Sequence, residues 1–147
     1  MKLTKKDDFI IFDKAIKLVL NDILVPFGID KQYNDYICKL SLNNENYKMF
    51  KIIEDDIIEN LIDIDEEYEL KTQIIHYRQF KSLKAKLYLV KNRIVTEIIN
   101  NESQIIGIDE IFNKNRFDMI LTTDRLWVKD NIVYYKWKII YMKKLQV

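Results

Sequence analysis

The sequence contains few of the residues that break regular structure and few of those that bind metal ions. Its 147 residues include two glycines, one proline, one cysteine and one histidine. So few glycines cannot form a glycine-rich phosphate loop. A lone histidine and a lone cysteine, without an HExxH or CxxC motif, form no recognisable metal site. With few flexible joints and no internal repeat, we expect one domain over residues 1–147 that binds neither a metal ion nor a cofactor.

The same scarcity applies to disulfides and to long apolar runs. Cys38 has no partner for an internal disulfide, and its neighbours Ile37 and Leu40 predict a small buried hydrophobic side chain rather than a nucleophile. Residues 1–9 lack the apolar run of a signal peptide. No segment is apolar enough to span a bilayer. We therefore expect a protein of the cytoplasm or of an organelle interior.

The charged residues are almost balanced, with 24 basic and 23 acidic side chains and a net charge of +1. A protein whose main partner is nucleic acid or a membrane surface usually carries a face of one sign, so this balance predicts neither partner. A local basic face through Lys136, Lys138, Lys143 and Lys144 is one interpretation of the C-terminal region. Lysines on a solvated strand edge, where they discourage aggregation, are the other interpretation and the one we favour.

Residues 117–142 carry the strongest pattern in the chain. They read as two strands joined by a tight turn at residues 129–131, and they contain both tryptophans. One face of the second strand carries large apolar side chains at a period of two: Val133, Tyr135, Trp137, Ile139 and Tyr141. A strand with one wholly apolar face is expected to lie over a core. We therefore expect this hairpin at the centre of a sheet.

The N-terminal third predicts helix. Apolar side chains recur at helical spacing in residues 9–23, with Asp7 or Asp8 as the cap and Pro26 and Gly28 at the end. Residues 29–42 fit a short helix and a strand equally well. A hairpin of residues 36–42 with 47–53, a short helix or crossover over 54–67, strands at 68–80 and 83–95, and a short helix at 104–112 complete the expectation. The predicted fold is α+β: a single antiparallel sheet of about five or six strands, with one or two N-terminal helices packed on one face.

Two patterns suggest catalysis only weakly. Glu69 and Lys71 form a Glu-x-Lys triplet, and metal-dependent nucleases use such a triplet to hold Mg²⁺ and assist the attacking water. In a chain that is 32% charged, this triplet arises easily by chance. His76 lies within a predicted strand, where a surface or hydrogen-bonded histidine is expected more often than a catalytic one.

Four segments together resemble the chorismate lyase-like families, which include bacterial chorismate pyruvate-lyase, its archaeal and plastid relatives, and the ligand-binding UTRA domains. The segments are residues 18–24, 68–71, 105–107, and the closing hairpin of 125–130 with 133–141. The resemblance implies a pocket over the sheet in which chorismate loses pyruvate and leaves 4-hydroxybenzoate, without a metal ion or cofactor. A fixed cation there binds the ring carboxylate, and apolar walls hold the ring.

The resemblance also implies positions for the ligand-binding residues. Lys71 stands where the carboxylate-binding arginine stands, and Trp137 stands where the catalytic glutamate stands, or Lys136 if the register slips by one. Neither can act as a carboxylic acid, so the catalytic residues are unknown. We expect a diverged chorismate lyase-like protein that binds a small aromatic or carboxylate ligand through Lys71, Leu24, Ile106, Gly107, Arg125 and Trp137. The alternative is a non-catalytic binding or assembly protein with an aromatic strand interface, and a metal-dependent nuclease is a more distant one.

Overall fold

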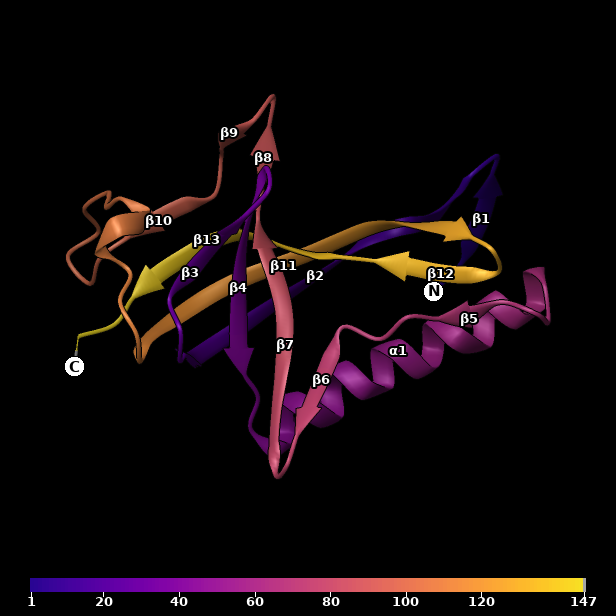
Figure 1. The fold of residues 1–147 in the computed structure, drawn as a ribbon, viewed down its shortest axis with the longest axis horizontal. Coiled ribbons are helices and arrows are strands. Elements are labelled where there is room, and N and C mark those ends of the chain that lie inside the picture. The colour runs from indigo at the N-terminus through magenta and orange to yellow at the C-terminus, as the bar shows by residue number, and fades with distance from the viewer. Residues whose placement is uncertain (147) are drawn as a thin grey trace.

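The computed structural model describes residues 1–146, which form many strands and one long helix (Figure 1). The strands are β1 (Leu3–Lys6), β2 (Phe9–Val25), β3 (Ile29–Gln32), β4 (Asp35–Ser41), β5 (Glu69–Leu70), β6 (Ile74–Tyr77), β7 (Phe80–Leu87), β8 (Leu89–Val90), β9 (Arg93–Ile94), β10 (Glu97–Ile99), β11 (Asn115–Lys129), β12 (Ile132–Tyr135) and β13 (Trp137–Lys144). The helix is α1 (Asn44–Ile64), and a 3-10 turn, η1 (Ile108–Glu110), precedes β11.

Five strands form a barrel. The hydrogen-bonded order is β2-β11-β13-β7-β4, and β4 in turn contacts β2. β11 pairs antiparallel with both β2 and β13, and β4 pairs antiparallel with β7. β13 pairs parallel with β7, with Trp137 opposite Ala85. The two strands of this parallel pair lie far apart in the sequence, which joins the two halves of the chain into one barrel.

The barrel interior is filled by the inward-facing side chains of these strands, and α1 lies along one side of it (Figure 1). Asn43 caps the helix, accepting a 2.8 Å hydrogen bond from the backbone N–H of Asn46. Phe50, Ile57 and Leu61 are buried at helical spacing on the inner face of α1. The Phe50 ring meets the Trp137 ring edge-on at a centroid distance of 5.4 Å. These contacts hold α1 against the strands.

The closing hairpin forms as the sequence predicts. β11 pairs with β12, and the turn between them has Asp130 and Asn131 at positive φ (52° and 65°), the conformation of a tight two-residue hairpin turn. Val133, Tyr135, Trp137 and Ile139 are all fully buried, which confirms the expected apolar face. Tyr141, at the end of that face, is half-buried.

The predicted N-terminal helix is wrong, because residues 9–25 form the long strand β2. β2 pairs with β11 along most of its length, and its register shifts twice, between Phe117 and Met119 and between Thr123 and Arg125. Each shift is a β-bulge or irregularity that breaks the period of two. Half-buried Ile16 therefore lies four residues from the buried Phe12 and Leu20, and buried Ile23 lies three residues after Leu20, which imitates helical spacing.

The predicted sheet is also wrong in size and type. Eleven strands form one mixed sheet, in which β13 pairs parallel with both β7 and β10, and β12 with β5. Residues 47–53, expected as a strand, belong to α1, so β4 pairs with β7 instead. Residues 29–42, left open between helix and strand, form β3 and β4. No helix within residues 1–146 is long and apolar enough to cross a membrane.

Cys38 is completely buried in β4, opposite Ala85 of β7, which confirms the sequence prediction. A thiol-specific reagent should therefore react with the native protein only as fast as the chain opens, since the thiol has no access to solvent. The measurement is the reaction rate at neutral pH, with the denatured protein as the control that shows one fully reactive thiol. A native rate equal to the denatured rate would contradict the burial.

Burial raises the pKa of the Cys38 thiol from 9.0 to about 12. Above pH 9 the unfolded chain loses this proton while the folded chain keeps it, so the free energy of unfolding falls as the pH rises from 9 towards 12, by up to about 1.4 kcal/mol per pH unit. Cys38→Ala lacks this contribution. The stability advantage of the wild type over Cys38→Ala should therefore shrink across that range in denaturant titrations. An advantage that stays constant would show that the thiol does not titrate differently in the two states.

Candidate nucleic-acid interface

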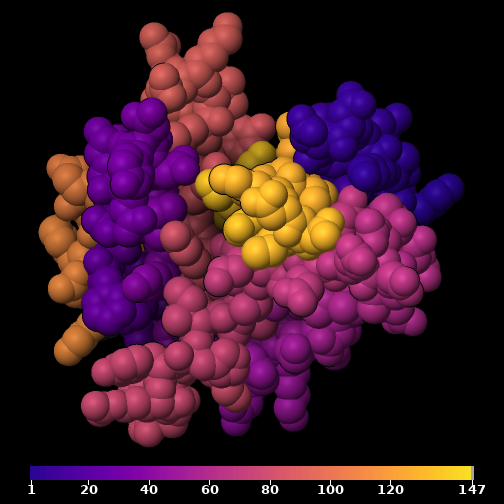
Figure 2. Space-filling view, turned by 45° about the vertical axis from the view of Figure 1, so that its right-hand side comes forward, coloured from indigo at the N-terminus to yellow at the C-terminus, as the bar shows by residue number. Residues whose placement is uncertain are grey.

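A groove of about 510 Å³ crosses the outer surface of the barrel. In Figure 2 the β12 region (yellow) stands forward of the β3–β4 region (purple), and the β7 region (pink) is recessed between them. The groove is lined by Gln32, Tyr33, Asp35, Ile37, Lys71, Thr72, Gln73, Ile75, Lys84, Ala85, Lys86, Trp127, Tyr134, Tyr135, Lys136 and Trp137. A second hollow of about 320 Å³ shares Lys86, Trp127 and Lys136 with it and adds Asp124, Arg125 and Lys138.

Aromatic rings stand on both walls of the groove. Trp127 of β11 and Tyr134 of β12 are cross-strand partners, and their rings stack with a centroid distance of 6.2 Å and an angle of 16°. On the other wall Tyr33 occupies the turn between β3 and β4, where it is 98% exposed. Trp127 and Tyr134 are half-buried. Flat rings that are open to solvent on part of their surface are platforms on which nucleobases stack.

Cations follow the same groove. The alternation of β7 buries Leu83, Ala85 and Leu87 in the barrel and directs Lys84 and Lys86 outward into the groove. Two further ammonium groups sit over aromatic faces: that of Lys136 lies 5.5 Å from the Trp127 ring centroid, and that of Lys138 lies 5.1 Å from the Tyr88 centroid. Lys136 and Lys138 are therefore each next to a ring, the pairing that a nucleotide's phosphate and base require.

Two carboxylates only partly neutralise these cations. Asp35 lies 3.7 Å from both Lys86 and Lys136. Asp124 lies 3.7 Å from Lys138 and 4.0 Å from Arg125. Partial burial lowers the pKa of Lys86, and the positive charge of Lys136 lowers it further, although Asp35 opposes both effects. The groove therefore keeps an excess of positive charge, which an anion would stabilise.

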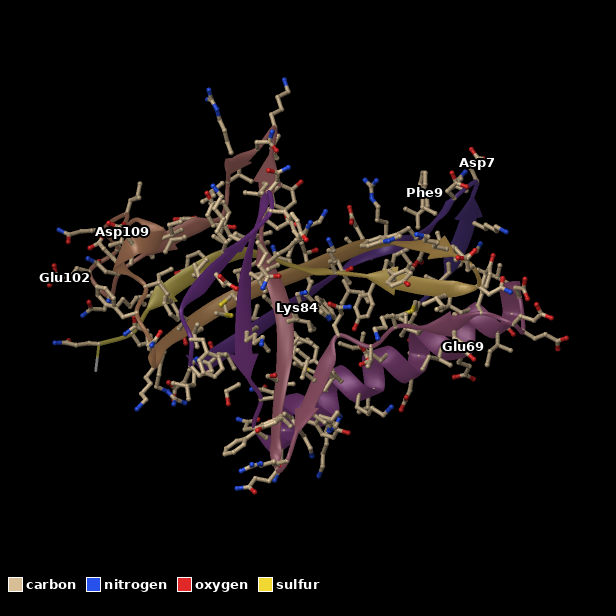
Figure 3. The ribbon with its side chains drawn as sticks, viewed as in Figure 1. Asp7, Phe9, Glu69, Lys84, Glu102 and Asp109 are labelled. Atoms are coloured by element: carbon tan, nitrogen blue, oxygen red, sulfur yellow. The ribbon has the colours of Figure 1, made fainter. Side chains whose placement is uncertain are left out.

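The near-zero net charge conceals a separation of charge across the molecule. Nine acidic side chains lie within residues 54–69, on α1 and the segment that follows it: Glu54, Asp55, Asp56, Glu59, Asp63, Asp65, Glu66, Glu67 and Glu69. In Figure 3 Lys84 lies near the centre of the molecule on β7, whereas Glu102 and Asp109 lie at one end and Glu69 and Asp7 towards the other. The balance of total charge therefore does not exclude a polyanion as a partner.

A buried carboxylate fixes the floor of the groove. Glu54 of α1 is only 3% exposed, and its Oε1 accepts a 2.5 Å hydrogen bond from the Thr72 hydroxyl. Its Oε2 accepts from the backbone N–H of Gln73 at 3.0 Å and from the Tyr135 hydroxyl at 2.5 Å. The Trp137 indole N–H donates to the same Tyr135 oxygen at 3.2 Å. Thr72, Gln73, Tyr135 and Trp137 also line the groove, so this network holds α1 and the groove floor in one arrangement.

The network also affects proton binding at Tyr135. Burial raises the pKa of the Tyr135 phenol, and the negative charge of Glu54 raises it further. The phenol therefore stays neutral and keeps donating to Glu54 through the physiological pH range. Trp137 itself is fully buried, so the floor is closed beneath the groove rather than hollow.

The six residues expected to bind a small acid do not form one pocket. Lys71 and Trp137 line the groove, and Arg125 lies in the adjoining hollow. Leu24 is half-buried on β2 opposite Arg116, Ile106 is half-buried beyond β10, and Gly107 begins η1; none of these three lines either hollow. The sequence pattern did not single out Tyr33, Lys84, Lys86, Trp127 or Tyr134 as site residues. The alternation of lysine with buried apolar residues in β7 was a local signal for two of them.

The strand order and the groove define a class of protein. In chain order the barrel strands are β2, β4, β7, β11 and β13, and around the barrel they run β2-β4-β7-β13-β11. The groove lies over β4 and β7, the second and third barrel strands. It is flanked by the β3–β4 hairpin, which follows the first barrel strand, and by the β11–β12 hairpin, which involves the fourth. This is an OB-like barrel, a fold whose corresponding surface binds oligonucleotides and oligosaccharides.

Solved structures with this fold include the single-stranded DNA-binding protein of bacteriophage Enc34. The C-terminally truncated form of that protein has a TM-score of 0.57 and 14% identity, over 99% of this chain and 94% of the other. The same protein in complex with ssDNA has a TM-score of 0.58 and 12% identity, over 97% and 93% of the two chains. Identities this low show a shared fold. No protein-family model and no curated protein sequence matches this chain.

These findings correct the resemblance drawn from the sequence. The chain has an OB-like barrel in place of the chorismate lyase-like sheet with its N-terminal helices, and its structural neighbours are single-stranded DNA-binding proteins. The expected chorismate-type activity, the small aromatic or carboxylate ligand, and the expectation that nucleic acid is not the main partner are therefore wrong. The resemblance rested on short apolar segments that many β-rich chains share.

Glu54→Ala should lower the free energy of unfolding by about 3 kcal/mol, because Tyr135 loses a charged acceptor while it remains fully buried beneath the groove, and Thr72 and Gln73 lose the same partner. In the double variant Glu54→Ala, Tyr135→Phe, the loss of free energy of unfolding should be about 1 kcal/mol smaller than the sum of the two single losses. Both single variants remove the same hydrogen bond between Tyr135 and Glu54, which the double variant can lose only once. Denaturant titrations followed by tryptophan fluorescence measure both quantities.

The matched control for this experiment is Glu59→Ala, which removes an exposed carboxylate from the same helix. It should change the free energy of unfolding by about 0.5 kcal/mol or less. Strictly additive losses in the Glu54 and Tyr135 variants would show that the two side chains are not energetically coupled.

Proposed function

We propose that this protein binds single-stranded DNA in the groove between the β3–β4 and β11–β12 hairpins, without catalysing a reaction. The observation that carries the proposal is the stacked Trp127–Tyr134 pair facing a row of outward lysines in an OB-like barrel. The likeness in fold to a protein solved in complex with ssDNA supports it. In this proposal residues 1–147 act as one binding domain.

The chemistry of the groove matches the two parts of an unpaired nucleotide. Bases stack on Trp127, Tyr134 and Tyr33, because every base has a flat π-face that a duplex would hide in its own stack. Phosphates pair with the ammonium groups of Lys84, Lys86, Lys136 and Lys138. Because stacking and charge pairing tolerate any base, we expect weak sequence preference.

Asp35 and Asp124 keep the lysines ordered in the free protein. Asp35 holds Lys86 and Lys136, and Asp124 holds Lys138, all at 3.7 Å and at partly exposed positions. Such exposed pairs are weak, so a phosphate can replace the carboxylate at little cost. We propose that the protein works in the cytoplasm or in an organelle interior, in a compartment where a genome is copied and single-stranded DNA arises.

The test is the binding of a fluorescent oligo-dT, measured by anisotropy over a range of salt concentrations. We expect the oligonucleotide to bind and a DNA duplex of equal length to compete poorly, since its bases are not free to stack. Trp127→Ala should weaken binding about 10-fold, the loss expected for one stacking platform. Lys86→Gln and Lys136→Gln should each reduce the salt slope by about 0.7, the value for one phosphate contact on a single strand.

Two variants outside the groove serve as controls. Phe112→Ala removes an exposed aromatic ring, and Lys14→Gln removes an exposed cation on β2; neither residue lines the groove. Both should bind like the wild type. Equal affinity for duplex and single strand, or an unchanged affinity in Trp127→Ala, would contradict the proposal.

A further inference from the structure

The β6–β7 hairpin projects from the barrel beside the start of α1 (Figure 1), and its outer face continues the floor of the groove. Ile75 of β6 and Lys84 of β7 line the groove. In the hairpin Ile75 pairs with Ser82, and Tyr77 pairs with Phe80. Because side chains alternate along a strand, Tyr77 and Phe80 lie on the same face as Ile75 and Lys84, one step further from the barrel.

This end of the hairpin repeats the combination of ring and cation found in the groove. Tyr77 is 65% exposed and Phe80 is 62% exposed, although large aromatic side chains are normally covered. The guanidinium of Arg78, in the turn between them, lies 5.4 Å from the centroid of the Tyr77 ring. Two exposed rings and one cation therefore stand together at the tip of the β6–β7 hairpin.

The opposite face of the hairpin is held against α1. His76 meets the ring of Tyr47 edge-on at 5.6 Å and 89°, and the Lys81 ammonium lies 3.8 Å from the centroid of the same ring. Tyr47 belongs to the beginning of α1, so these contacts anchor the hairpin. Tyr77 and Phe80 are thus presented on a fixed support.

The surface between the groove and the β6–β7 hairpin carries positive charge that no carboxylate pairs with within residues 1–146. Lys39 of β4 and Lys84 of β7 are direct cross-strand partners, and both are exposed. Like charges opposite one another destabilise a sheet, and neither lysine forms a salt bridge with any of residues 1–146. An anion bound between them would relieve this repulsion.

We propose that single-stranded DNA leaving the groove passes over Lys39 and Lys84 and continues onto the β6–β7 hairpin, where its bases stack on Tyr77 and Phe80. This inference rests on the proposed function and extends the binding site beyond the groove. Nucleic acid fits the hairpin face better than a protein partner does, because the face is continuous with the groove and adds the cations of Lys39, Lys84 and Arg78 to open aromatic rings.

The experiment compares two oligo-dT lengths: one of about six nucleotides, which the groove alone accommodates, and one of about 16 nucleotides, which also reaches the hairpin. The double variant Tyr77→Ala, Phe80→Ala should bind the long oligonucleotide about 10-fold more weakly than the wild type and the short one with unchanged affinity. Tyr77→Phe, which keeps the ring, should bind both lengths like the wild type. Phe27→Ala combined with Phe112→Ala, which removes two exposed rings away from this path, is the matched control.

The outcomes separate this inference from the function on which it rests. If the wild type binds neither length, both proposals are overturned. If the wild type binds both lengths and the double variant weakens neither, or weakens both equally, the hairpin site is overturned while the groove remains. If the double variant instead loses self-association on a sizing column with DNA binding unchanged, the hairpin face is an interface between protein molecules and the inference is wrong.

Discussion

The groove of this protein depends on one buried carboxylate. A charged group removed from water is stable in a protein only if several donors satisfy it. The donors to Glu54 come from two parts of the chain: Thr72 and the backbone of Gln73 lie in the segment before β6, and Tyr135 belongs to β12. Their hydrogen bonds are satisfied together only when α1, the segment before β6 and the β12–β13 region take their observed places. The position of the helix and the shape of the groove floor therefore have a common cause.

The second constraint is the separation of charge. Acidic side chains gather on α1 and the segment after it, while lysines face outward from β7 and from the β12–β13 region. The local potential of a surface depends on the charges near it and on the shape that focuses them, rather than on the total charge of the chain. A protein with a net charge of +1 can therefore present a groove that attracts a polyanion.

Features of this fold that depend on residues close together in the sequence were predicted correctly, and features that depend on distant residues were not. The β11–β12 hairpin and its buried apolar face were predicted correctly, because alternation and turn residues act over a few neighbouring positions. β2 was mistaken for a helix because two shifts of register opposite β11 disturb its alternation. Of the groove, Lys71 and Trp137 were assigned to a ligand site, and Lys136, with Lys138 of the adjoining hollow, was noticed as a possible basic face. Tyr33, Lys84 and Trp127 were not recognised, since nothing local shows that they face one another.

The sequence by itself determined the local elements: the closing hairpin, the burial of Cys38, and the alternation that directs the lysines of β7 outward. Only the tertiary structure decided that β7 lies parallel to β13 and that α1 supplies Glu54 beneath Tyr135. It also decided that the β3–β4 hairpin and the β11–β12 hairpin line the same groove. The physical reason is that strand pairing and charge burial join residues far apart in the chain. Their free energy depends on all the strands at once, and no short segment carries that information.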